Sequence, residues 1–281
     1  MSTRELSHCA EAVRRLDRDR WLTLLFAHPG DREALAALYA FNQEIARVRD
    51  RVSEPMLGAI RLEWWRESLR GSGAGAVRRH PVVEALAVAI AARDLPEEEL
   101  LALVDAREQD LDGEGFRNLN DLVAYCEATG GGLSRLAARV CGAVSAEVLD
   151  AATAVGTGWA LTGLLRALAF EAAQRRTVLP GAVLARAGLA RGALFRGSFP
   201  EPLRPVAADM ADRARQAFVA ARRARRHIPP RARNGFLLAT LASDYLRRLA
   251  RAGNDPFRAA FERGIVGRRM RVLWAALRAR Y

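Results

Sequence analysis

The sequence contains no lysine, although the chain is strongly basic. Arginine supplies all 44 basic side chains, which outnumber 32 acidic ones and give a net charge of +12. Without lysine there is no Gly-Lys-Ser/Thr signature of a phosphate-binding loop, so the glycine-rich stretch 71–75 is interpreted as a flexible connection. The charge still favours an anionic partner, for which phospholipid head groups, diphosphates and nucleic acid are the candidates.

Cysteine and histidine are also scarce. The three cysteines, Cys9, Cys126 and Cys141, are odd in number and lack CxxC spacing, which argues against a disulfide framework and indicates a reducing compartment. The four histidines form no HExxH or similar pair, so a zinc site is not expected. The N-terminal stretch lacks the apolar core of a signal peptide, and no run of about 18 apolar residues occurs. We therefore expect a cytoplasmic protein, or one that is peripheral on the inner membrane.

Patterns typical of β-strands are nearly absent as well. Alternating runs of Val, Ile and Thr are rare, whereas Ala, Leu and Arg, all good helix formers, dominate the chain. Neither a repeat nor a clear linker is found, so the sequence predicts one all-α domain over residues 1–281. The expected helices are 4–26, 31–51, 54–70, 81–93, 96–112, 119–127, 131–142, 145–174, 181–189, 203–227, 232–252 and 255–280.

A run of arginines lies near residue 225. Arg222, Arg223, Arg225 and Arg226 fall at the end of one expected helix. They form either a solvated face or a surface for anionic lipid. Nucleic-acid binding is less favoured, because no aromatic residues are interleaved with the arginines and no DNA-binding motif accompanies them.

Three segments carry a more specific pattern. They are residues 38–69 (LYAFNQEIARVRDRVSEPMLGAIRLEWWRESL), residues 122–140 (LVAYCEATGGGLSRLAARV) and residues 175–180 (RRTVLP). In order and spacing they resemble the squalene/phytoene synthase family, whose members condense two prenyl diphosphates head to head. The resemblance implies an isoprenoid-synthase-type helical bundle around a central cavity. A subgroup that includes a mitochondrial assembly factor for respiratory complex I resembles residues 47–67 more closely still.

The resemblance implies two magnesium-binding D-x-x-x-D motifs on facing helices. Carboxylates four residues apart share one helix face, where they can hold the Mg²⁺ ions that neutralise a leaving diphosphate. The first motif aligns with Ala46 and Asp50, and the second with Ala167 and Glu171. Each helix thus keeps one acid. Asp50 and Glu171 are the candidate metal ligands, and magnesium binding is expected to be weakened.

The resemblance also supplies candidate substrate-binding and catalytic residues. Arg166 and Arg176 match arginines of the family pattern, and Arg47, beside the first motif, is a further candidate for binding a diphosphate. Tyr39 and Tyr125 fall where the family has active-site tyrosines. Tyrosines in such positions are more often core residues than catalytic ones, so packing is the alternative role for both.

The two acids also have plainer alternatives. Asp50 would be an ordinary carboxylate at a helix end, and Glu171 would pair with Arg175 at i,i+4 spacing. Trp64 and Trp65 are interpreted as packing anchors. These alternatives stay open on the sequence alone.

Two hypotheses of function follow. In the first, the chain is a squalene/phytoene synthase-like protein with eroded motifs, non-catalytic or altered. It would bind a prenyl-diphosphate- or lipid-like anion, assist assembly of a respiratory complex, or both. In the second, it is an active magnesium-dependent prenyltransferase that condenses two molecules of farnesyl or geranylgeranyl diphosphate. The expected partners are a prenyl diphosphate or anionic lipid, a membrane surface and a respiratory complex subunit.

Overall fold

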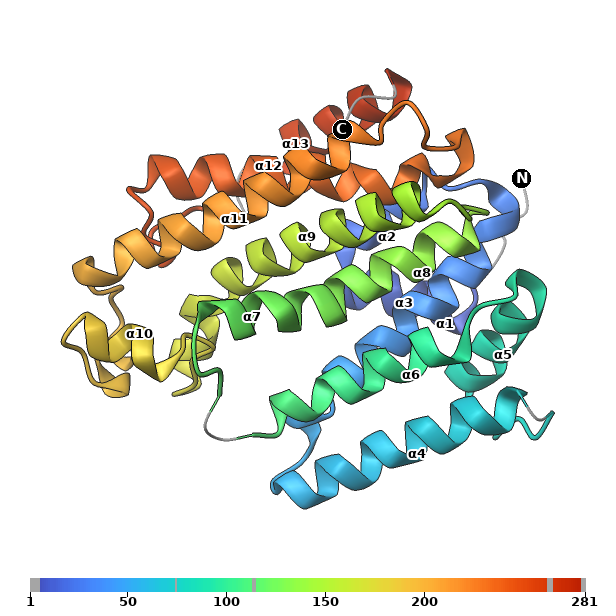
Figure 1. Ribbon diagram of the computed structural model, residues 1–281, viewed down its shortest axis with the longest axis horizontal. Helices are drawn as coiled ribbons and strands as arrows, with labels where there is room; N and C mark the ends of the chain where they lie inside the picture. The colour runs from blue at the N-terminus through green and yellow to red at the C-terminus, as the bar shows by residue number, and fades with distance from the viewer. Residues whose placement is uncertain (1–5, 74, 113–114, 262–264, 279–281) are drawn as a thin grey trace.

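The computed structural model describes residues 6–73, 75–112, 115–261 and 265–278, and every regular element in these ranges is a helix (Figure 1). The all-α expectation is therefore confirmed. The α-helices are α1 (His8–Leu16), α2 (Arg18–Leu24), α3 (Arg32–Ala46), α4 (Pro55–Gly73), α5 (Pro81–Arg93), α6 (Glu97–Ala106), α7 (Leu119–Cys126), α8 (Gly132–Val140), α9 (Ala146–Ala173), α10 (Gly181–Arg186), α11 (Arg204–Arg223), α12 (Arg233–Arg251) and α13 (Ile265–Leu277).

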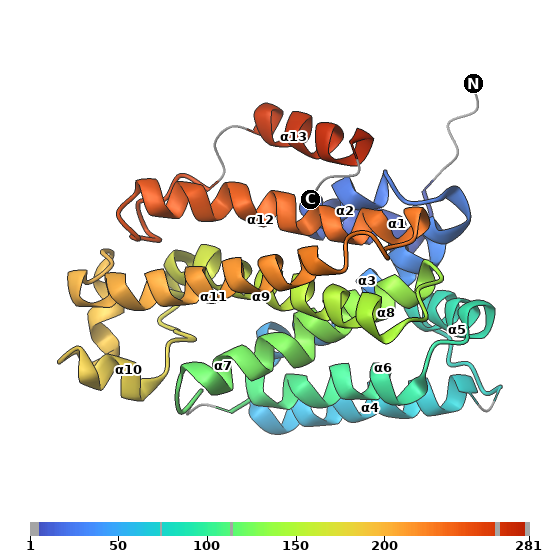
Figure 2. The same cartoon turned by 45° about the horizontal axis from the view of Figure 1, so that its top comes forward.

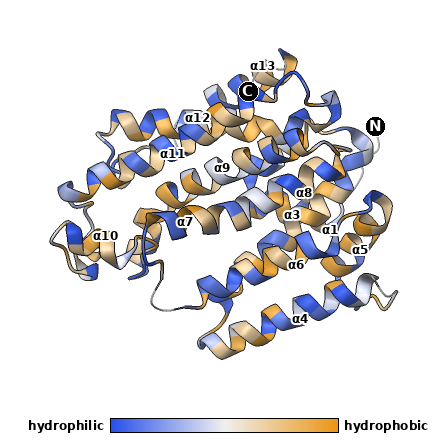
Figure 3. Cartoon of the chain, in the orientation of Figure 1, coloured by the Kyte–Doolittle hydropathy of each residue, from blue (hydrophilic) through white to orange (hydrophobic). Residues whose placement is uncertain are grey.

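The longest helix, α9, lies at the centre of the bundle, with α8, α11 and α12 packed against it (Figure 1). Ser145 caps its start by accepting a hydrogen bond from the backbone N–H of Val148. By length and composition α9 could cross a membrane, but 61% of its most apolar window is buried inside the fold. Figure 3 shows mostly hydrophobic residues along α9, whereas hydrophilic and hydrophobic residues are mixed along outer helices such as α4 and α11. It is the core helix of this bundle.

Glycines allow α9 to approach its neighbour closely. A π-helical turn, Glu127–Gly131, joins α7 to α8 and packs on α9. A Cβ atom at Gly156 would lie 2.0 Å from the carbonyl oxygen of Gly130, which is closer than real atoms come. The glycine-rich stretch 130–132 therefore serves helix packing in this fold.

A buried ion cluster joins distant parts of the chain. Asp31, at the start of α3, has a fully buried carboxylate. Its oxygens lie 2.7 Å from Nη2 of Arg93 on α5 and 2.7 Å from Nη2 of Arg231, just before α12. The burial of this charge is compensated because two guanidinium groups surround it.

Several expected helix boundaries were wrong. The expected helix 4–26 breaks at Asp17, whose carboxylate caps α2 by accepting from the backbone N–H of Arg20. The expected helix 31–51 ends at Ala46 and continues only as a 3₁₀ turn, Arg49–Arg51. Similarly, 96–112 becomes α6 followed by the 3₁₀ turn Arg107–Asp110.

The last expected helix, 255–280, begins ten residues later than predicted. Gly253 and Asn254 adopt left-handed conformations after α12, and the Asp255 carboxylate accepts hydrogen bonds from the backbone N–H groups of Phe257 and Arg258. These contacts form a turn in place of the first helical residues. Helix α13 then lies on the outer side of α12 (Figure 2).

Candidate functional site

The two acids that survive from the expected metal motifs meet at one arginine. Nη1 of Arg176 donates to Asp50 at 2.9 Å, and Nε of the same guanidinium donates to Glu171 at 2.9 Å. We call these three residues the acid–arginine bridge. Asp50 and Glu171 are thus brought together in space, as the sequence predicted, but a guanidinium already lies between them.

Local backbone geometry places Arg176 in this position. Helix α9 ends at Ala173, and Arg175 adopts a left-handed conformation with φ of +56°. The chain turns back, so that the backbone N–H of Arg176 donates to the carbonyl oxygen of Glu171 at 2.8 Å. The turn points the Arg175 guanidinium over the ring of Phe195 instead. The expected Glu171–Arg175 pair is therefore replaced by a Glu171–Arg176 pair.

Asp50 comes from the 3₁₀ turn that follows α3, so it is a carboxylate just beyond a helix end. Its side chain is about half exposed, whereas those of Arg176 and Glu171 are mostly covered. Burial alone would lower the pKa of Arg176, but the hydrogen bonds and charges of Glu171 and Asp50 outweigh burial and raise it. The guanidinium is a permanent positive charge between the two acids.

The positions one turn upstream offer no replacement acid. Ala46 is the last residue of α3, and Ala167 is half-buried on α9. Gly163, a further turn back, faces open space, since a Cβ atom there would meet nothing within 4 Å. Among the described residues, no group of three or more His, Cys, Asp and Glu side chains could hold a metal ion. Two acids that already share one arginine are a poor donor set for Mg²⁺, because the guanidinium offsets half of their charge and occupies carboxylate oxygens of both.

Tyr125 lies in a polar network whose hydrogen bonds involve none of the bridge residues. Its hydroxyl donates to Asp110 at 2.6 Å and accepts from Nη1 of Arg107 at 2.7 Å. The same guanidinium donates to the side chain of Asn42 on α3 at 3.2 Å. Burial raises the pKa of the Tyr125 phenol, and Arg107 only partly opposes this effect. The phenol therefore stays protonated as a hydrogen-bond donor, in a network that ties α3 and α7 to the 3₁₀ turn after α6.

Arg166 belongs to a third cluster. Its Nη1 lies 3.0 Å from the Asp19 carboxylate of α2, and its guanidinium carbon lies 3.8 Å from the ring centre of Tyr245 on α12. The Tyr245 hydroxyl donates to Asp19 at 2.7 Å and accepts from Arg268 of α13 at 2.7 Å. Arg166 and Arg176, both candidates for binding diphosphate, thus pair with different acids.

Tyr39 is a core residue. Its side chain is buried among apolar neighbours, with the Arg20 guanidinium 5.6 Å from its ring centre. Burial raises the pKa of its phenol. The void beside it, also lined by Ser134 and Phe236, measures about 10 Å³. That volume accommodates at most one water molecule.

Arg47, the last candidate for diphosphate binding, follows α3 directly. Its backbone N–H donates to the carbonyl oxygen of Gln43 and closes the helix. Trp64 and Trp65 of α4 lie edge-on to His80, and Trp65 also packs against Phe41 of α3, as expected for packing anchors. The structure therefore joins Asp50, Glu171 and Arg176 in one bridge, whereas Tyr39, Tyr125 and Arg166 make their side-chain contacts elsewhere.

Sequence reasoning missed the residues that hold the tyrosine networks. Asp19 lies in the first turn of α2, and Arg107 and Asp110 form an ion pair at i,i+3 spacing. The i,i+3 spacing of Arg107 and Asp110 could have predicted this local ion pair. Tyr245 and Arg268 carried no such signal, because their partners are remote in sequence.

Comparisons with known proteins agree with this fold. The chain is 30% identical over 251 residues to the mouse protein named NADH dehydrogenase (ubiquinone) complex I, assembly factor 6; the match covers 89% of this chain and 75% of the mouse protein. It is 25% identical over 217 residues to a chloroplastic phytoene synthase of Arabidopsis thaliana, covering 75% of this chain and 51% of that protein.

Solved structures show the same architecture. A squalene synthase from Alicyclobacillus acidocaldarius superposes with a TM-score of 0.78 at 24% identity, covering 88% of this chain and 94% of that one. A dehydrosqualene synthase solved with a ligand gives 0.82 at 18% identity, covering 97% and 95%. The family model for squalene/phytoene synthase matches residues 13–276. The chain therefore belongs to the squalene/phytoene synthase family.

Proposed function

We propose that this chain has the family fold without head-to-head prenyl transfer, and that it assists the assembly of a respiratory complex at the membrane. The acid–arginine bridge carries the proposal. Ionising a prenyl diphosphate requires metal charge held by several carboxylates. Here the only two acids kept from the motifs, Asp50 and Glu171, share one guanidinium, that of Arg176, which offsets half of their charge.

The interior supports the same proposal. Pockets that hold ligands of drug size enclose about 300–1,000 Å³. The void beside Tyr39 measures about 10 Å³, and the polar network of Tyr125 is satisfied by Arg107 and Asp110. A long isoprenoid chain has no room beside Tyr39, the residue expected to be catalytic.

The assembly role is supported by the relatives. The mouse protein, whose name gives a complex I assembly factor, is 30% identical over most of this chain. Assembly requires a surface that recognises a partner, not a metal centre. We infer that a respiratory complex subunit is the protein partner and that the chain works in the cytoplasm, peripheral on the inner membrane.

The first experiment tests for prenyl transfer. The purified chain is incubated with farnesyl or geranylgeranyl diphosphate, with and without MgCl₂, and pyrophosphate release and extracted hydrocarbon are measured. No release above a heat-treated sample is expected. Magnesium-dependent release that disappears in the Asp50→Ala and Glu171→Ala variants would refute the proposal and establish an active transferase.

A second experiment tests whether Ala46 and Ala167 occupy the positions of the lost metal ligands. Restoring both acids in the triple variant Ala46→Asp, Ala167→Asp, Arg176→Ala creates two carboxylate pairs. Magnesium binding by calorimetry should increase relative to the wild-type chain. No increase would contradict the placement of Ala46 and Ala167 at the former metal site.

The assembly role is tested by deleting the gene in its own organism. NADH dehydrogenase activity is followed in native gels of the membranes. Loss of the assembled complex, rescued equally by the wild-type gene and by the Asp50→Ala variant, is expected. An intact complex in the deletion strain would refute the assembly role.

A further inference from the structure

Helix α13 is attached to the bundle by one face only. Arg268 is buried on that face and hydrogen-bonds to the hydroxyl of Tyr245, while Val272 is fully buried. Arg271 forms an ion pair with Asp244 of α12 from the edge of the face. Figure 2 shows α13 resting on the outside of α12. The attachment fixes which side of α13 points away from the protein.

The outward side of α13 is apolar. Met270, Leu273, Trp274 and Leu277 are all exposed, Trp274 to 53% and Leu277 to 73%. Their i, i+3, i+4, i+7 spacing forms a single stripe on a helix of 3.6 residues per turn. The stripe lies opposite Arg268 and Val272. A helix on the surface of a soluble bundle would present polar side chains there, so the stripe indicates a binding surface.

Arginines border this stripe on both sides. At 100° per residue, Arg269 lies on one flank, and Arg271 and Arg278 lie on the other. The Arg278 guanidinium carbon is 4.7 Å from the ring centre of Trp274. Apolar residues that include tryptophan, flanked by arginine, are the pattern of a helix lying in a membrane interface.

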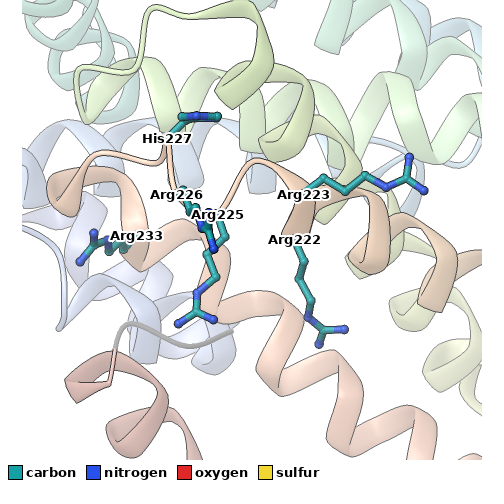
Figure 4. A pocket seen from close by; sticks show the side chains of 6 residues that line it. All are labelled: Arg222, Arg223, Arg225, Arg226, His227 and Arg233. Carbon is teal, nitrogen blue, oxygen red and sulfur yellow. The ribbon is translucent and has the colours of Figure 1, made fainter.

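The basic surface continues beyond α13. A hollow of about 430 Å³ between α12 and α13 is lined by Arg222, Arg247, Arg271, Arg278, Thr240, Ser243, Trp274 and Ala275. Arg222 also borders a second hollow of about 740 Å³, at the turn from α11 to α12, where the other lining residues are Arg223, Arg225, Arg226, His227 and Arg233 (Figure 4). Among the described residues, no carboxylate belongs to the lining of either hollow, although Asp244 pairs with Arg247 and Arg271, and Glu147 pairs with His227. Because Arg222 lines both hollows, and Trp274 of the stripe lines one of them, the basic surface is continuous with the apolar stripe.

We propose that α13 and these two basic hollows dock the protein on an anionic phospholipid bilayer. The stripe enters the interface between head groups and acyl chains, and the arginines contact lipid phosphates. Charge complementarity selects a lipid surface over an apolar protein groove, because arginines rather than mixed charges surround the stripe. This inference adds a membrane-binding surface to the proposed function, and it rests on that function only in assuming that the protein works at a membrane.

The test uses the full chain and liposome flotation. Vesicles of phosphatidylcholine alone are compared with vesicles that also contain phosphatidylglycerol, at low and high salt. Binding to the anionic vesicles only, weakened by salt, is expected. The double variant Trp274→Gln, Leu277→Gln should lose about a hundredfold in vesicle affinity. The double variant Arg223→Gln, Arg226→Gln should lose about 25-fold, or about fivefold per arginine.

A matched control replaces exposed valines elsewhere, Val88 on α5 and Val144 before α9, by glutamine. This control should bind vesicles like the wild-type chain, and all variants should keep the wild-type Tm. The proposal is overturned if wild-type protein does not float, or if the Trp274→Gln, Leu277→Gln variant floats as well as wild type. A third outcome is that neither wild-type protein nor any variant binds vesicles, but the Trp274→Gln, Leu277→Gln variant loses self-association or binding to a respiratory subunit. In that case the stripe binds protein and the membrane proposal is wrong. Vesicle binding without any assembly phenotype would reject the assembly role and leave this inference standing.

Discussion

Removing the central arginine of the bridge should turn a magnesium-indifferent protein into a magnesium-responsive one. In Arg176→Ala, Asp50 and Glu171 face each other without the guanidinium that binds both. Two partly exposed ion pairs contribute about 1 kcal/mol together. Like charges at about 6 Å repel by roughly 1 kcal/mol when water screens them. The variant should therefore be less stable by about 2 kcal/mol in EDTA.

The assay is thermal unfolding in EDTA and in MgCl₂ at matched ionic strength. For a chain of this size, a loss of about 2 kcal/mol lowers Tm by about 4 °C. A site with a Kd of about 1 mM would restore about 1.4 kcal/mol at ~10 mM Mg²⁺. The control is Arg175→Ala, since that guanidinium lies over the ring of Phe195 and not between the acids. An equal magnesium response in wild-type protein, or an unchanged Tm in Arg176→Ala, would refute the role given to Arg176.

Three further results are expected. Gly156→Ala should destabilise the fold by more than the ordinary overpacking cost of about 1–3 kcal/mol, because the new Cβ atom would lie 2.0 Å from a backbone oxygen. The control, Gly163→Ala in the same helix, should leave Tm unchanged or raise it, because the new Cβ atom would meet nothing within 4 Å. Burial disfavours the charge of Asp244, but hydrogen bonds from Arg248 and Arg271 outweigh burial and lower its pKa below the ordinary 3.8. Its stabilising effect is thus complete above pH 3.8 and lost as the pH falls further, so Asp244→Asn should flatten an acid titration of Tm in that range. The three cysteine thiols, whose pKa values burial raises to about 11 or 12, should react with iodoacetamide only after unfolding in urea.

Local patterns predicted most of the helices. Helix α9 was expected at 145–174 and is found at Ala146–Ala173, because its apolar run begins at a serine cap and ends where the chain reverses. The boundaries that failed depend on side chains that bond to the backbone. Asp17 starts a second helix within 4–26, and Asp255 builds a turn where helix was expected. Both carboxylates accept hydrogen bonds from backbone N–H groups that would otherwise bond within a helix. The spacing of apolar residues gives no sign of such bonds.

The candidate site was predicted only in part. Alignment with the family motifs indicated that Asp50 and Glu171 lie together, and they do. That Arg176 would lie between them depends on the left-handed backbone of Arg175 and on a contact 126 residues apart in sequence. Arg166, also a candidate for substrate binding, pairs with Asp19, which is 147 residues away. Partners so distant in the chain are fixed by the packing of α2, α9 and α12, not by local spacing.

The ion cluster at Asp31 also bears on the order in which the chain folds during synthesis. Its fully buried carboxylate needs the guanidinium of Arg231, made 200 residues later. Until Arg231 has been synthesised, burying Asp31 in the N-terminal helices would leave its charge compensated by Arg93 alone, which is costly. The N-terminal helices therefore pack together only after most of the chain has been synthesised, and their apolar faces stay exposed until then. A nascent chain of this kind is a natural client of holding chaperones, and a truncated product should be degraded rather than accumulate as a folded fragment.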